Sequence, residues 1–234
     1  MTTLTSPPPT TLGDDARARR AGTGLLVACS AYLVAAAMMG LVFASDPPAQ
    51  LLGRLAEYQQ GELLYRWGFV GASLMAPAFV TTLLLLITVA GVPPTAARRS
   101  VATVLLAAYV SFATFAYGSQ YTFLPRLVAR DPEAAAAWYF HDVGSVPYGI
   151  DLAGYALLSL AALLLASLLV ERGRRWLAGW LTAMAVLSLA AFASYAAGAD
   201  ALAGVTTIAS AVCTVPVVAL AAIEGRRLRA GAQP

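Results

Sequence analysis

Six uninterrupted apolar blocks run along the sequence, and they constrain its fold more than any other feature. The hydrocarbon core of a bilayer is about 30 Å thick, so a helix needs roughly 20 apolar residues to span it. The blocks show neither the alternation of a half-buried strand nor the stripe of an amphipathic helix. They predict an all-α protein, a polytopic bundle of six transmembrane helices. The expected spans are residues 22–44, 69–90, 101–122, 148–170, 176–197 and 201–223.

The overall composition excludes a water-soluble domain. Hydrophobic residues make up 59% of the 234 residues, and charged residues only 12%. A soluble domain of this size could not cover its surface with so few charges. The bilayer itself is therefore the expected partner, and an integral membrane protein is the class that remains.

The distribution of arginine predicts the orientation. The 15 basic residues are all arginines, since the chain has no lysine. With six spans, 11 arginines fall on the side of the termini and four on the other side. The positive-inside rule therefore places both termini in the cytoplasm. The net charge of +3 follows from this topology and predicts no nucleic-acid partner. The alanine- and arginine-rich composition is typical of a high-GC bacterium, so we expect a bacterial cytoplasmic membrane.

The two ends of the chain are predicted to be cytoplasmic tails around one membrane domain. Residues 1–21 are rich in proline and threonine and are expected to be disordered. The six-helix domain covers residues 22–223, and residues 224–234 form a basic flank. The first apolar block is longer than the 7–15 residues of a signal-peptide core, so we expect it to be retained.

Short connections on the side of the termini predict three antiparallel hairpins in one bundle. Two long loops on the opposite side begin with Asp46-Pro47 and Asp131-Pro132. Aspartate at the N-cap followed by proline at the first helical position is a helix-start signal. Each loop is therefore predicted to hold a short helix on the outer surface. Pro77 and Pro216 lie within spans and are expected to kink them.

The chain lacks residues that several functional classes of membrane protein require. A retinal protein needs a lysine, whereas haem carriers and zinc proteases of the membrane need two or more histidines. Only His141 is present, and no Gly-x-Ser-x-Gly, Walker or His-Glu-x-x-His motif occurs. The two cysteines, Cys29 and Cys213, fall inside spans and are interpreted as small apolar fillers. We therefore predict no catalytic residue, no metal site and no cofactor.

Polar residues gather near the outer side, and they are the candidate ligand-binding residues. Asp151 lies about one turn inside its span, where an ionisable group is a default functional candidate. Its alternative role is structural, since an acid near a helix start is favoured by the helix dipole. Arg66 could pair with Asp151 or could anchor its span at the headgroup level. A buried Gln120 would need a partner. The predicted ligand-binding set is Arg66, Gln120, Arg126, Asp142 and Asp151.

The stretch "LLYRWGFVG" at 63–71 resembles a family of uncharacterised bacterial six-helix membrane proteins. An outer loop in that family ends in a Phe/Tyr-Arg-x-Gly element that enters the second helix. Tyr65, Arg66 and Gly68 match this element. The resemblance implies the six-helix topology over the first four helices and carries no activity.

Three functions stay open on the sequence alone. The first is a small permease, or a protein that binds a small ligand or lipid in an outward-facing polar pocket. The second is a membrane-embedded enzyme acting on a lipid or extracytoplasmic substrate, with His141 and Asp142 as acid and base. The third is an accessory or scaffold subunit whose outer loops bind a partner. The absence of catalytic motifs favours the first.

Overall fold

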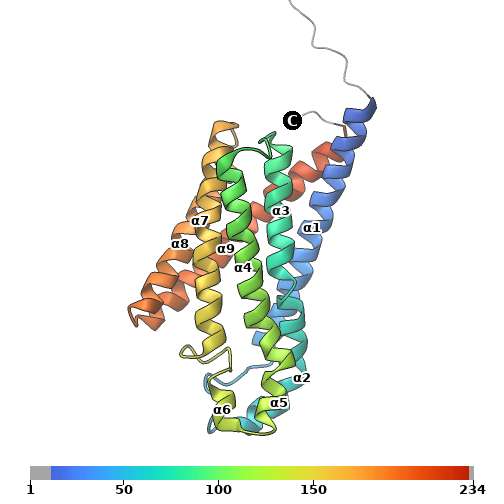
Figure 1. Cartoon of the computed structure of the whole chain (residues 1–234). Helices are drawn as coiled ribbons and strands as arrows, with labels where there is room; N and C mark the ends of the chain where they lie inside the picture. The colour runs from blue at the N-terminus through green and yellow to red at the C-terminus, as the bar shows by residue number, and fades with distance from the viewer. Residues whose placement is uncertain (1–11, 232–234) are drawn as a thin grey trace, which may run out of the picture.

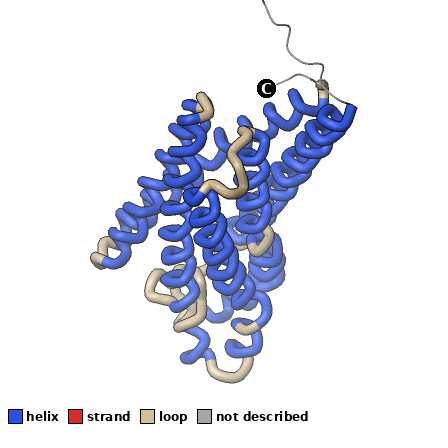
Figure 2. The backbone as a smooth tube through the Cα atoms, turned by 45° about the horizontal axis from the view of Figure 1, so that its top comes forward, coloured by secondary structure: helices blue, strands red, loops and turns tan. Residues whose placement is uncertain are grey.

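The computed structural model describes residues 12–231, and within them every regular element is a helix (Figures 1 and 2). The prediction of an all-helical bundle is confirmed. The helices, in chain order, are α1 (Leu12–Ala44), α2 (Leu55–Ala72), α3 (Met75–Val89), α4 (Ala97–Thr122), α5 (Leu124–Val128), α6 (Pro132–Ala136), α7 (Val146–Glu171), α8 (Arg175–Ala196) and α9 (Asp200–Arg229).

Six helical segments are long and apolar enough to cross a membrane, and the chain is a multi-pass membrane protein. They are α1, the α2–α3 pair, α4, α7, α8 and α9, and each covers a block expected from the sequence to within one residue. The α2–α3 pair extends from Leu55 to Val89, which makes it the longest of the six. Its two helices are separated at Ser73 and Leu74, just before Pro77. This break lies one turn before Pro77, where the missing proline N–H leaves the helix without a backbone donor. By contrast, α9 continues through Pro216.

The six spans form a closed ring. Each packs against the next span along the chain, and the last helix, α9, packs against the first, α1. Figure 1 shows the start of α1 and the end of α9 converging at one end of the bundle, whereas α5 and α6 lie at the opposite end. We call these the arginine end and the loop end. The loop end consists of residues 45–54, 123–145 and 197–199.

The contact between α1 and α9 closes the ring at two glycines. A Cβ atom at Gly22 would lie 2.6 Å from the carbonyl oxygen of Gly225, so the two backbones touch directly. Further along the same stripe, the Tyr32 hydroxyl lies 2.8 Å from the Thr214 hydroxyl. Small residues such as Gly22 and Gly225 let membrane helices approach closely enough for van der Waals contact to hold them together.

The first long loop differs from its prediction. Asp46 has a φ angle of 44°, in the left-handed region, so it does not start a helix. The next helix begins only at Leu55 and runs directly into the span, which leaves no separate surface helix. In the second loop the prediction is confirmed: Asp131 accepts a hydrogen bond from the Ala134 N–H at 3.0 Å and caps α6.

The predicted tails are shorter than expected. Helix α1 begins at Leu12, so residues 12–21 are helical where the composition predicts disorder; residues 1–11 lie outside the described part. Helix α9 continues to Arg229 and includes most of the predicted C-terminal flank. Both extensions add turns to helices that are already nucleated, which is easier than starting new ones.

Candidate functional site at the loop end

The side chain of Gln120 is the central polar contact of the loop end. Its carbonyl oxygen accepts from the Tyr65 hydroxyl at 2.9 Å and from the Phe140 N–H at 3.1 Å. Its amide group donates to the Trp138 carbonyl at 3.0 Å and to the Ser119 hydroxyl at 2.7 Å. Gln120 is fully buried, and these bonds satisfy both of its polar atoms. It therefore joins α2, α4 and the second loop, and its capacity for a ligand is already used.

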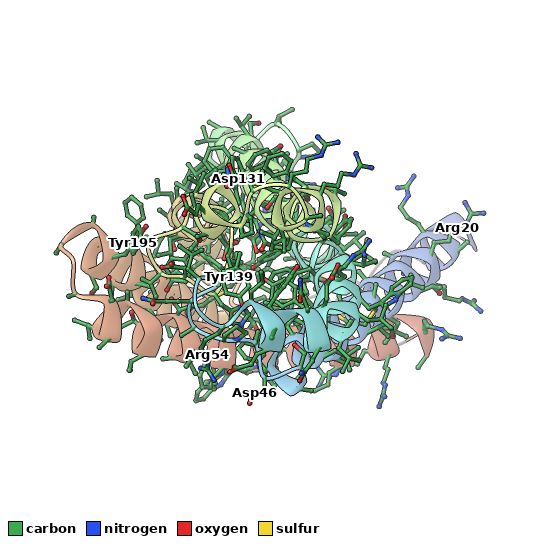
Figure 3. The ribbon with its side chains drawn as sticks, turned by 90° about the horizontal axis from the view of Figure 1, so that it is seen from below. Arg20, Asp46, Arg54, Asp131, Tyr139 and Tyr195 are labelled. Atoms are coloured by element: carbon green, nitrogen blue, oxygen red, sulfur yellow. The ribbon has the colours of Figure 1, made fainter. Side chains whose placement is uncertain are left out.

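Aromatic rings fill the space around this contact. Tyr139 is fully buried and stacks on Tyr65, with ring centroids 5.7 Å apart, and Tyr58 meets both rings edge-on. The Tyr139 hydroxyl donates to the carbonyl of Pro48 at 2.8 Å and so joins the second loop to the first. Figure 3 shows Tyr139 in the interior of this end, with Asp131 and Asp46 toward opposite edges. The second loop therefore folds inward and closes the loop end of the bundle.

His141 belongs to this aromatic cluster. Its ring lies 5.6 Å from the Tyr65 ring and 5.9 Å from the Tyr139 ring, measured between centroids. Burial lowers the pKa of His141 to about 4, and its Nδ1 has no hydrogen-bond partner among the described residues. The neighbouring Asp142 accepts from the Gly144 N–H at 3.0 Å in a turn, so its carboxylate stabilises the loop. No hydrogen bond joins His141 to Asp142 among the described residues.

Asp151 lies beneath the aromatic cluster in the second turn of α7. It is only 6% exposed, and one carboxylate oxygen, Oδ2, accepts from the Tyr117 hydroxyl of α4 at 3.2 Å. The other oxygen, Oδ1, is buried and has no partner among the described residues. A carboxylate has room for several donors, so Asp151 retains unused acceptor capacity.

Tyrosine rings surround Asp151. Tyr148 and Tyr155 lie three residues before and four residues after it, so all three project from the same face of α7. The Tyr155 ring packs against Tyr109 of α4, with centroids 5.8 Å apart. The α4–α7 contact is close because Gly154 meets the Tyr109 ring, where an added Cβ would lie 3.5 Å from Cδ2. A single carboxylate thus lies among several phenol rings inside the bundle.

The structure does not gather the five predicted ligand-binding residues in one pocket. Arg66 is exposed and bonds Glu62 at 3.3 Å on its own helix, so the suggested pair with Asp151 is not formed. Arg126 is exposed on α5, Asp142 stabilises a turn, and Gln120 joins three segments. Of the predicted set, Asp151 alone is buried with an unpartnered oxygen.

The tyrosines that surround Asp151 were not predicted as part of a site. Tyr148 and Tyr155 follow from helical spacing once the start of α7 at Val146 is known. Tyr139 looks like an interfacial residue in the sequence, and only the inward course of the second loop buries it. Within residues 12–231, no cluster of histidine, cysteine and acidic residues could hold a metal ion.

The chain matches no family model, no curated protein and no solved structure. The resemblance of the Tyr65-Arg66-x-Gly68 element to a six-helix family therefore stays a prediction. The fold alone defines the class of the protein, a multi-pass membrane protein.

Proposed function

We propose that the protein binds a small cationic ligand at Asp151, within a membrane bundle that the second loop covers, and that it acts as a small permease or a ligand-binding membrane protein. The observation that carries this proposal is the buried Asp151 carboxylate with its unpartnered Oδ1. Asp151 lies in the second turn of α7, and ionisable residues buried within a membrane span commonly mark binding sites and ion pathways.

The chemistry around Asp151 favours a cation. A positive charge next to the carboxylate would offset its desolvation. The faces of the tyrosine rings carry negative potential and attract cations, and organic ammonium groups are bound in this way. Tyr117 and Tyr155 approach from two helices, which suits a compact ligand enclosed between α4 and α7.

Access to Asp151 would require movement of the second loop. Residues 137–145 lie over α2 and α4, and their contacts there pass through Gln120 and Tyr65. We infer that this segment opens toward the loop end, while the ring of helices stays closed. The enzyme alternative receives no such support, because His141 and Asp142 face different surroundings.

A docking role is the second candidate function. Arg126 of the loop end and Arg66 of α2 have exposed side chains, as a surface that meets a partner protein would require. Substituting both by glutamine would release such a partner but would leave cation binding at Asp151 intact.

The test uses the full chain in lipid nanodiscs and a panel of small cations: methylammonium, tetramethylammonium and guanidinium. A bound cation raises the melting temperature because it stabilises only the folded state. We expect at least one cation to stabilise the wild type and to have no effect on Asp151→Asn. Asp142→Asn, which removes a carboxylate of the second loop, is the control and should respond like the wild type. If Asp151→Asn responds as strongly as the wild type, or if no cation in the panel stabilises either, the proposal fails.

We further propose that the arginine end faces the cytoplasm of a bacterial cell, because arginine is enriched on the inner side of membrane proteins. Cysteine labelling tests this in a Cys29→Ala, Cys213→Ala background. A membrane-impermeant maleimide should label Gly53→Cys on intact cells and should label Gly231→Cys only after lysis. The reverse pattern would contradict the orientation.

A further inference from the structure

A cavity lies at the arginine end, where α7, α8 and α9 meet the end of α3. Its volume is about 330 Å³, and its walls come from the ends of α3, α7 and α9 and from the start of α8. The floor is apolar, with Leu86, Leu169 and Leu220 among its residues. Three arginines and one glutamate line its rim: Arg174, Arg175, Arg227 and Glu224.

The charges of this rim do not balance. Glu224 accepts from Arg174 at 2.9 Å and lies 4.0 Å from Arg227. Arg175 forms no ion pair within the described residues. The rim therefore carries one carboxylate for three guanidinium groups, and its net charge is positive. This arrangement favours an anionic group that can take several hydrogen bonds from arginine.

The start of α8 adds to this preference. Its N-cap, Arg174, makes no side-chain cap, and the next three residues, Arg175–Leu177, also line the cavity. The first bond of the α8 backbone runs from the Ala178 N–H to the Arg174 carbonyl, so the three N–H groups before it lack partners in the helix. A helix N-terminus with free N–H groups is a binding site for phosphate-like anions.

An exposed tryptophan places the cavity at the depth of the lipid headgroups. Trp176 lines the rim and is 82% exposed, and Trp180 lies one turn further along α8 with 40% exposure. Exposed tryptophans on membrane helices prefer the boundary between headgroups and acyl chains. A molecule with an anionic head and an apolar tail would place the head at the arginines and the tail on the leucine floor.

We propose that this cavity binds one anionic phospholipid of the surrounding leaflet, held by its phosphate. The phosphate lies against Arg175, Arg227 and the N-terminus of α8, and the first part of an acyl chain lies on the apolar floor. Basic pockets between membrane helices recognise lipid phosphates by this chemistry. The site is separate from Asp151 and does not depend on the function proposed for it.

Fluorescence of Trp176 tests the proposal. The chain contains four tryptophans. Trp67→Phe, Trp138→Phe and Trp180→Phe leave Trp176 as the only one. The full chain is placed in phosphatidylcholine nanodiscs, and brominated phosphatidylglycerol or brominated phosphatidylcholine is added as the quencher. We expect phosphatidylglycerol to associate at Trp176 about 25-fold more strongly than phosphatidylcholine, since Arg175 and Arg227 each contribute on the order of a fivefold preference for an anionic headgroup.

Charge variants show whether the preference comes from the cavity. Arg175→Gln combined with Arg227→Gln should abolish it. Arg19→Gln combined with Arg226→Gln removes the same charge at the same end but outside the cavity, and should leave it intact. Equal losses in both variants would mean a general surface attraction and would overturn the site. Native mass spectrometry of the chain with all four tryptophans gives a second measurement, the number of phosphatidylglycerol molecules retained.

Inorganic phosphate separates a lipid from a soluble anion. If millimolar phosphate leaves the quenching by phosphatidylglycerol unchanged, the apolar floor contributes and the lipid assignment stands. If phosphate displaces the lipid at comparable concentrations, the cavity is a site for soluble phosphate and the lipid assignment is wrong.

Discussion

The hydroxyl group of Tyr139 donates a hydrogen bond to the carbonyl oxygen of Pro48, although the two residues are 91 positions apart in the sequence. This bond joins the two long loops inside the bundle and lies next to the stacked ring of Tyr65. The loop end is therefore one packed unit whose parts come from both loops and from α2 and α4. Several expected results follow from its contacts.

Replacing Gln120 by leucine should destabilise the protein by about 3 kcal/mol. The change leaves the Tyr65 hydroxyl, the Phe140 N–H and the Trp138 carbonyl without their partner, and each buried unsatisfied group costs about 1–3 kcal/mol. Thermal unfolding in detergent measures the effect. Gln60→Leu, at an exposed position of α2, is the control and should unfold close to the wild type.

Removing the hydroxyl of Tyr139 should loosen both loops together. Tyr139→Phe keeps the ring stacking but loses the bond to Pro48, with an expected loss of about 1 kcal/mol. Hydrogen exchange should become faster in residues 45–54 and 137–145 and stay unchanged in α8. Tyr121→Phe is the matched control, because the Tyr121 hydroxyl makes no hydrogen bond within the described residues. Faster exchange in one loop alone would contradict the link between them.

Acidification should destabilise the protein through His141. Its pKa is lowered to about 4 in the folded state, from an ordinary value of 6.5, because burial opposes the charged ring. The unfolded chain therefore takes up the proton first, and stability falls as the pH drops from about 6.5 to about 4. The loss is at most about 3 kcal/mol. Melting temperatures between pH 7 and pH 4 should fall less steeply for His141→Gln, which cannot titrate; identical slopes would argue against a buried His141.

Exchanging the charges of Arg66 and Asp151 should not restore either single variant. Arg66 bonds Glu62 on its own helix, and Asp151 accepts from Tyr117 on another. The double variant Arg66→Asp, Asp151→Arg would place an arginine in a buried site without an acidic partner. Its expression and melting temperature should be lower than those of Asp151→Asn. Recovery toward the wild type would instead show that the two residues interact.

An alanine at Gly22 should destabilise the contact between α1 and α9 by about 1–3 kcal/mol. The added Cβ would lie 2.6 Å from the Gly225 carbonyl and 2.9 Å from the Leu228 Cβ, so the helices must move apart. Gly40→Ala on the same helix is the control. A Cβ there meets nothing within 4 Å, and alanine is the better helix former, so stability should stay equal or rise slightly.

The spans were predictable because their length and hydropathy are set by the bilayer alone. The loop end was predicted less well, since its structure depends on contacts between distant segments. Asp131 starts a helix as its local signal indicates, whereas Asp46 with the same signal does not. Pro48 of the first loop accepts a hydrogen bond from Tyr139 of the second, and no local pattern specifies that contact.

The candidate site was predicted in part for the same reason. Asp151 stands out in the sequence because an acid is rare in an apolar block. A buried Gln120 was expected to need hydrogen-bond partners, but the sequence did not identify those partners. Arg66 was linked to Asp151 by depth and opposite charge, yet depth does not specify which way a side chain points around its helix.

The glycine contact between α1 and α9 has a consequence for biosynthesis. The first helix enters the membrane early, but the surface that completes its packing belongs to the last one. Until translation is almost finished, the bundle is an incomplete arc with the face around Gly22 turned toward lipid. A protein shortened before α9 would keep five inserted helices but would lack a closed ring. The uncovered face of α1 would distinguish unfinished copies from complete ones and could mark them for degradation.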